Sequence, residues 1–203
     1  MEKQYYFSFI DDVIWVLRDL TREAPQSLFD NGFFKILKNA HEKYSLKVQL
    51  NLFYRTDFYY GMDEFNLSMV TDKYKNEFEN ASDWLKFGFH SLQEFPDYPL
   101  VNSSYGDVYK LYNMIKNEVI RFAGEESFAV GVMPHWLPVS FEGCRALCDC
   151  GAKLVAVSVG EKKEYDGNPD SLPYGHAGRL LQNKQPETML FTRDTKNTAI
   201  ASS

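Results

Sequence analysis

Two adjacent carboxylates, Asp11 and Asp12, follow the first apolar segment of the chain, residues 5–10. That segment predicts a buried strand, and α/β folds place their chemistry at the carboxyl ends of strands. If the strand pleat holds to its end, the two side chains diverge, so one can ligate a cation while the other acts as a base. The alternative is structural, because aspartate also caps helices and a helix is expected from Val13.

A histidine stands at the end of each of two later apolar segments, His90 and His135. Glu94 follows His90 by four residues, and one helical turn would bring that imidazole and carboxylate to the same face. The carboxyl ends of parallel strands share one edge, so we expect three groups to converge there: Asp11 with Asp12, His90 with Glu94, and His135 with Trp136. A carboxylate of the aspartate pair, the His90 imidazole and the Glu94 carboxylate would then form one ligand set. Such a ligand set suits zinc or another first-row divalent metal.

The elements that must position these groups alternate along the chain. Strands are expected over residues 5–10, 47–54, 83–90, 127–133 and 153–159, and helices over residues 13–20, 31–44, 72–78, 104–122 and 140–151. This alternation predicts an α/β domain with a mostly parallel sheet, open or rolled into an incomplete barrel. We expect one domain over residues 1–203, with a core at 4–160 and a loop-rich extension at 161–203 that ends in two short strands.

Charge and hydropathy argue against two classes of partner, nucleic acids and membranes. The net charge is −6, and the chain has no run of lysines and arginines, which argues against a nucleic-acid partner. The sequence contains no apolar stretch of membrane-spanning length, and its start resembles no signal peptide, so we expect a cytoplasmic protein without a membrane partner.

Cysteines and aromatic residues give two further expectations. Cys144, Cys148 and Cys150 have no fourth partner for a closed zinc site, and we expect Cys144 and Cys148 to be small buried residues of a helix. Aromatic residues make up 16% of the chain, and Tyr54 and Trp136 follow predicted strands, where such rings could stack on a sugar. The sequence therefore permits a carbohydrate ligand.

The order of motifs resembles the polysaccharide deacetylase superfamily, the NodB-homology domains of carbohydrate esterase family four. Residues 9–13, Phe-Ile-Asp-Asp-Val, correspond to its Thr-Phe-Asp-Asp-Gly motif, and residues 90–94, His-Ser-Leu-Gln-Glu, to its His-Ser/Thr-x-x-His motif. The resemblance covers about residues 4–160 and implies a deacetylase-type (β/α) barrel. It also implies Asp11 as the base, and Asp12, His90 and Glu94 as ligands of Zn, with Co, Mn or Ni as alternatives.

The chain departs from the family pattern at several positions. Val13 replaces a glycine, Glu94 replaces the second histidine, and the arginine expected before Pro134 is missing. No late Leu-x-His motif supplies the general acid, which leaves His135 and His176 as candidates. Two functions follow. One is a metal-dependent hydrolase that removes an acyl group, first of all acetyl, from a carbohydrate or a related amide or ester; the other is a degenerate domain that binds a sugar or metal without turnover.

Overall fold

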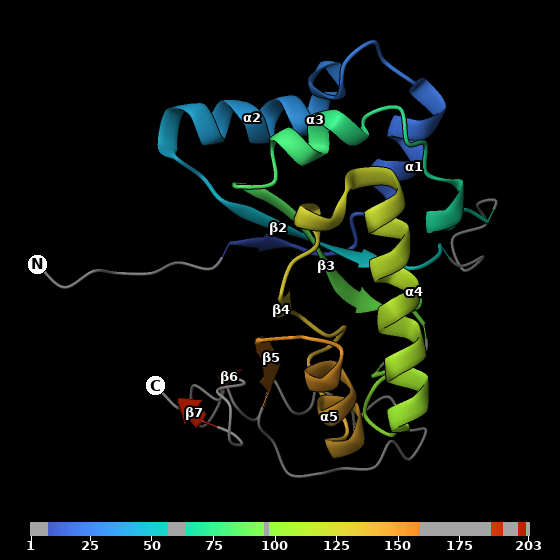
Figure 1. Ribbon diagram of the computed structural model, residues 1–203, viewed down its shortest axis with the longest axis vertical. Coiled ribbons are helices and arrows are strands. Elements are labelled where there is room, and N and C mark those ends of the chain that lie inside the picture. Colours follow the sequence, from blue (N-terminus) through green and yellow to red (C-terminus); the bar gives the residue numbers. More distant parts are fainter. Residues whose placement is uncertain (1–7, 57–63, 96–97, 159–187, 193–198, 202–203) are drawn as a thin grey trace, which may run out of the picture. The chain divides into compact units, whose positions relative to one another are not determined.

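The computed structural model describes residues 8–56, 64–95, 98–158, 188–192 and 199–201 (Figure 1). Contacts divide the chain into two units. Unit 1 holds residues 1–88 and 114–129, and unit 2 holds residues 89–113 and 130–203. Strand β3 (Leu85–Ser91) and helix α4 (Tyr105–Ala123) contribute residues to both units.

Unit 1 combines short parallel strands with three helices of its own (Figure 1). Its elements are β1 (Phe9–Ile10), α1 (Ile14–Glu23), the 3-10 helix η1 (Leu28–Asp30), α2 (Gly32–Tyr44), β2 (Val48–Phe53), the 3-10 helix η3 (Leu67–Met69), α3 (Lys75–Asn80) and the 3-10 helix η4 (Glu125–Ser127). The strands form a sheet of order β1-β2-β3, and β1 pairs with β2 in parallel.

Aromatic side chains fill the core of unit 1. Phe78 of α3 meets Phe34 of α2 and Phe87 of β3 edge to face, with ring centroids 5.5 and 5.1 Å apart. All three rings are buried, and edge-to-face pairs of this kind add stability beyond the burial of area. This packing holds α2 and α3 against the sheet.

Local signals in the sequence set the helix ends. The Asn31 side chain accepts hydrogen bonds from the Phe33 and Phe34 amides and so begins α2. In unit 2, the Ser140 hydroxyl accepts from the Gly143 amide at the start of α5 (Phe141–Asp149), and Gly151, with a φ of 101°, follows its end. Both helices lie where the apolar spacing predicts them.

Unit 2 contains the second sheet. Its strands are β4 (Gly131–Val132), β5 (Leu154–Ser158), β6 (Thr188–Thr192) and β7 (Ala199–Ala201), in the order β4-β5-β6-β7. The first pair is parallel, and the β5–β6 and β6–β7 pairs are antiparallel. The two short strands expected near the end of the chain are therefore confirmed.

The structure confirms a mixed α/β architecture with parallel strand pairs. The described residues show no closed barrel; their strands form two sheets rather than the single sheet expected. Only residues 9–10 of the predicted first strand are described as strand, and Phe9 is exposed. The fourth strand is shorter than expected because η4 occupies its predicted start. The loops predicted over residues 161–186 lie outside the described residues.

Two further expectations are answered by the structure. None of the helices in the described part of the chain combines the length and apolar character that a membrane crossing needs. Cys144 and Cys148 are half-buried rather than buried, so the expectation of two fully buried thiols is wrong. Burial, with a smaller effect from Cys148, still raises the pKa of the Cys144 thiol to about 11.

Candidate metal centre

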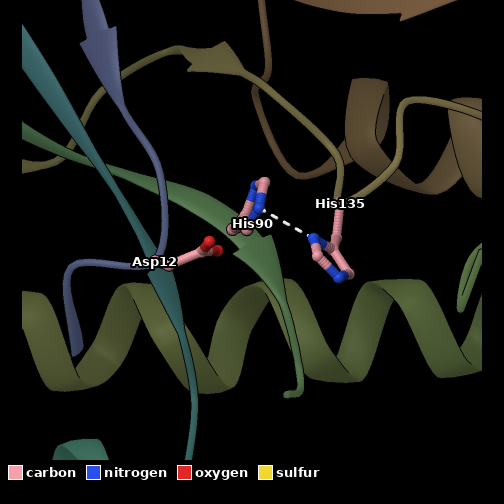
Figure 2. Close-up of side chains that lie close together, drawn as sticks. All are labelled: Asp12, His90 and His135. Atoms are coloured by element: carbon pink, nitrogen blue, oxygen red, sulfur yellow. Dashed lines mark hydrogen bonds between the residues drawn. The ribbon is translucent and has the colours of Figure 1, made fainter. Parts of the chain in front are cut away.

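Two buried imidazoles, His90 and His135, lie next to each other in unit 2 (Figure 2). His90 is near the end of β3, and His135 follows β4 in the loop after Pro134. His135 Nδ1 lies 3.0 Å from His90 Nε2, and the two rings meet at an interplanar angle of 67°. The His135 amide also donates to the His90 carbonyl at 3.1 Å, so main chain and side chain both join the loop to the strand.

His90 Nε2 and His135 Nδ1, the inner nitrogens, face each other. The other nitrogen of each ring, the outer nitrogen, faces a backbone carbonyl. His90 Nδ1 lies 2.6 Å from the Met133 oxygen, and His135 Nε2 lies 3.0 Å from the Glu94 oxygen. A carbonyl oxygen can only accept, so both outer nitrogens carry protons. In two neutral imidazoles the inner nitrogens would then hold lone pairs that face each other at 3.0 Å. This arrangement repels unless a positive charge is present, either a shared proton or a metal ion.

The imidazole pair fits a first-row divalent cation. Metal-ligating histidines donate their other ring N–H to a carbonyl or carboxylate, which orients the ring, and both histidines here have such a partner. Two nitrogens on one tetrahedral Zn²⁺, each at about 2.0–2.1 Å, are about 3.3 Å apart. The observed 3.0 Å is close to that separation. Imidazole also favours zinc and its neighbours over magnesium or calcium.

Asp12, in unit 1, is a possible third ligand beside the two imidazoles of unit 2. Asp12, His90 and His135 are the one such set of possible ligands found among the described residues. Asp12 is half-buried and has a φ of 61°, a left-handed conformation that is uncommon outside glycine. The strand pleat therefore does not continue through Asp12, contrary to the simplest expectation for its side chain.

A chain of buried amides in unit 1 reaches Asp11. Asn51 Nδ2 donates to the Asp11 carboxylate at 2.7 Å, and Asn51 Oδ1 accepts from Gln49 Nε2 at 2.6 Å. A carboxylate oxygen accepts hydrogen bonds, so Asn51 must turn its NH₂ group toward Asp11 and its oxygen toward Gln49. Gln49 must then present its own NH₂ group to that oxygen, so the orientation of both amides is fixed. Gly88 leaves room for them, because a Cβ there would lie 2.6 Å from Asn51 Oδ1 and closer still to Gln49 Nε2.

The structure does not favour the capping alternative for the aspartate pair. Helix α1 begins at Ile14, its N-cap residue is Val13, and no side chain caps it. Asp11 and Asp12 instead occupy the turn between β1 and that residue. Their presence at this turn is therefore not explained by helix capping.

Glu94 lies on the outer side of His135. Its carboxylate Oε1 is 3.7 Å from His135 Nε2, and its main-chain oxygen is the hydrogen-bond partner of the same nitrogen. Bends at residues 92 and 94 replace the helical turn that would align Glu94 with His90. The structure thus pairs His135, not Glu94, with His90.

The remaining sequence candidates have separate surroundings. Trp136 stacks on Tyr98 with ring centroids 5.8 Å apart, and it also lies beside the His135 ring at 5.4 Å. Tyr54 is half-buried, and its carbonyl accepts from the Leu67 amide. His176 lies outside the described residues.

Asn51 and Gln49 are the functional candidates that sequence reasoning missed. Their alternation with apolar neighbours predicts an outward-facing polar set, yet all six residues of β2 are buried. The signal that could have found them is the position of β2 within a parallel sheet, because strands covered on both faces need partners for polar side chains. No protein-family model, curated protein or solved structure matches the chain.

Proposed function

We propose that the protein is a divalent-metal-dependent hydrolase that removes an acyl group, first of all acetyl, from a carbohydrate or a related amide or ester. The observation that carries the proposal is the His90–His135 pair, whose inner nitrogens face each other at 3.0 Å while both outer nitrogens face carbonyls. The aspartate pair at the end of β1 and the motif order that resembles polysaccharide deacetylases support the acyl-transfer chemistry.

In this proposal Asp12, His90 and His135 hold the cation. When bound, a divalent ion supplies Lewis-acid chemistry, which polarises an acyl carbonyl and makes water more acidic. Zinc suits two imidazoles and one carboxylate best, and Co, Mn and Ni are the alternatives. The carbonyl partners of His90 and His135 keep the inner nitrogens directed toward the ion.

Asp11 acts as the general base. It accepts a hydrogen bond from Asn51 on one oxygen, which holds the carboxylate in one orientation. A base that is already held in the reactive orientation increases the reaction rate, because no further ordering of the carboxylate is needed before the proton is transferred. With His135 assigned to the cation, the role of general acid toward the leaving group passes to His176.

Metal titration of purified variants tests the metal centre. Wild-type protein should bind one Zn²⁺ per chain, and His90→Gln and His135→Gln should each weaken binding at least about 10–100-fold. The matched control is His41→Gln, because His41 bonds to the Leu46 carbonyl and stacks on Trp84, outside the group. Wild-type affinity in both His90→Gln and His135→Gln would refute the proposed ligands.

Acetate release tests the reaction. Acetylated chito-oligosaccharides are incubated with protein that has been stripped of metal and then reloaded with Zn²⁺, Co²⁺, Mn²⁺ or Ni²⁺. Metal-dependent release of acetate supports the hydrolase. Stoichiometric metal binding without release from any acylated substrate supports the second candidate, a domain that binds without turnover, which is favoured by the absence of a late Leu-x-His motif.

A further inference from the structure

A cavity of about 430 Å³ lies in unit 2, at the end of β3 and the start of α4. Most of its lining is apolar and includes Leu92, Phe95, Leu100, Val101, Val108 and Leu111. Cavities that bind small molecules have volumes of about 300–1,000 Å³, with a mostly apolar lining and a few polar atoms. The cavity therefore has the size and lining of a small-molecule site.

The Ser91 hydroxyl is a buried polar atom of this lining that the protein leaves unsatisfied among the described residues. Ser91 is fully buried, and its Oγ has no hydrogen-bond partner among the described residues. A buried hydroxyl without a partner costs about 1–3 kcal/mol, and native proteins rarely tolerate one without a reason. Ser103, another hydroxyl of the lining, already donates to the Leu100 carbonyl. A molecule in the cavity would give Ser91 the missing partner.

The lining also sets the charge of the occupant. Asp107 carries a formal charge, but its carboxylate accepts from the Ser104 hydroxyl and its amide donates back to that hydroxyl, as a helix-capping pair. The other lining residues are neutral. We propose that this cavity binds a neutral, largely apolar molecule with one hydrogen-bonding group, and that this group meets the Ser91 hydroxyl.

This site is separate from the metal centre. Ser91 follows His90 on β3, and successive side chains of a strand leave it on opposite faces. An aromatic contact joins the two places, because Tyr98 lines the cavity and stacks on Trp136, which lies beside the His135 ring. The proposed cavity ligand therefore does not depend on the proposed hydrolase activity. Because Trp136 stacks on a residue of the lining, its fluorescence emission should report occupancy of the cavity.

Toluene and p-cresol are the probes, since they share an apolar ring and differ by one hydroxyl. Isothermal titration calorimetry should detect binding of both, with p-cresol binding about two- to tenfold tighter because it gains a hydrogen bond. Ser91→Ala should abolish this preference while toluene still binds. Trp136 emission should change on binding, and Trp136→Phe should lose that signal.

Leu111→Trp fills the cavity and should abolish binding of both probes. The matched control is Tyr109→Trp, which adds the same ring to an exposed position of α4. Val101→Phe, at a half-buried position of the lining, is the second cavity-filling variant if Leu111→Trp does not fold. Absence of binding to the wild type, or unchanged binding by a folded cavity-filling variant, overturns the proposal. An unchanged p-cresol preference in Ser91→Ala overturns the role of the hydroxyl.

Discussion

Asn51 Nδ2 donates a hydrogen bond to the Asp11 carboxylate at 2.7 Å, from the middle of one strand to the residue that follows its neighbour. Asn51 is fully buried, and its own oxygen is held by Gln49. The amide pair therefore leaves Asp11 little freedom to rotate. In the proposed hydrolase the Asn51–Asp11 hydrogen bond holds the general base in position. If Asp11 had only a structural role, the same bond would serve only to stabilise the fold.

Substitution of the two adjacent carboxylates should separate base from ligand. Asp11→Asn should keep Zn²⁺ affinity near the wild-type value and reduce acetate release by about 10²–10⁴-fold, the usual contribution of a general base. Asp12→Asn should lose the metal. Metal titration and acetate release on the same preparations measure both effects, and the opposite pattern would show that the two roles are exchanged.

The amide chain should behave as one unit in unfolding experiments. Asn51→Leu should destabilise by about 1–3 kcal/mol because Gln49 and Asp11 each lose a buried partner. The double variant Gln49→Leu/Asn51→Leu should cost less than the sum of the single variants, by about 0.5–3 kcal/mol. Urea denaturation of all four proteins gives this coupling free energy. Additive single effects would show that the two amides do not depend on each other.

Gly88 should not tolerate even one methyl group. Gly88→Ala places a Cβ 2.6 Å from Asn51 Oδ1, so we expect a loss of about 1–3 kcal/mol from overpacking. Gly32→Ala is the matched control, because no atom lies within 4 Å of the corresponding Cβ and Gly32 is helical. That control should be neutral or slightly stabilising. Equal melting temperatures for the two variants would contradict the tight fit at Gly88.

Stability should fall at alkaline pH. Burial raises the pKa of the Cys144 thiol from 9.0 to about 11, and burial with a smaller effect of Cys150 raises the pKa of the Tyr112 phenol from 10.0 to about 12. Above about pH 9 the unfolded chain loses these protons while the folded chain retains them, so the free energy of unfolding decreases until about pH 12.

Denaturation of the wild type at intervals between pH 7 and 12 measures this decrease. Cys144→Ala should reduce the slope between about pH 9 and 11, and Tyr112→Phe should reduce it between about pH 10 and 12. Slopes identical to the wild type in both variants would show that neither group is linked to unfolding.

Much of the fold could be predicted because its helices carry local signals. Asn31 and Ser140 cap their helices through side chains within three residues, so short windows of sequence suffice. Strand pairing depends on residues far apart in the sequence. The assignment of β4 and β5 to a separate sheet from β1, β2 and β3 could not be obtained from periodicity.

The candidate metal centre was predicted in part for the same reason. Strand ends indicated Asp12 and His90, since a carboxylate or histidine after an apolar run is visible in the sequence. His135 is predicted at the same edge, but as a candidate general acid rather than a ligand. Its pairing with His90 depends on a main-chain hydrogen bond between two segments 45 residues apart, which no spacing rule encodes. Glu94 was expected as a ligand because a helical turn was assumed where the chain bends.

The loop that carries His135 continues into two successive left-handed residues, Trp136 with a φ of 61° and Leu137 with a φ of 76°. Such conformations cost about 1–3 kcal/mol each in residues other than glycine. These conformations directly follow His135, whose ring is hydrogen-bonded at both nitrogens. The free energy needed to immobilise this imidazole is therefore spent when the protein folds. An incoming ligand would then meet a preorganised ring and would have little conformational entropy left to remove.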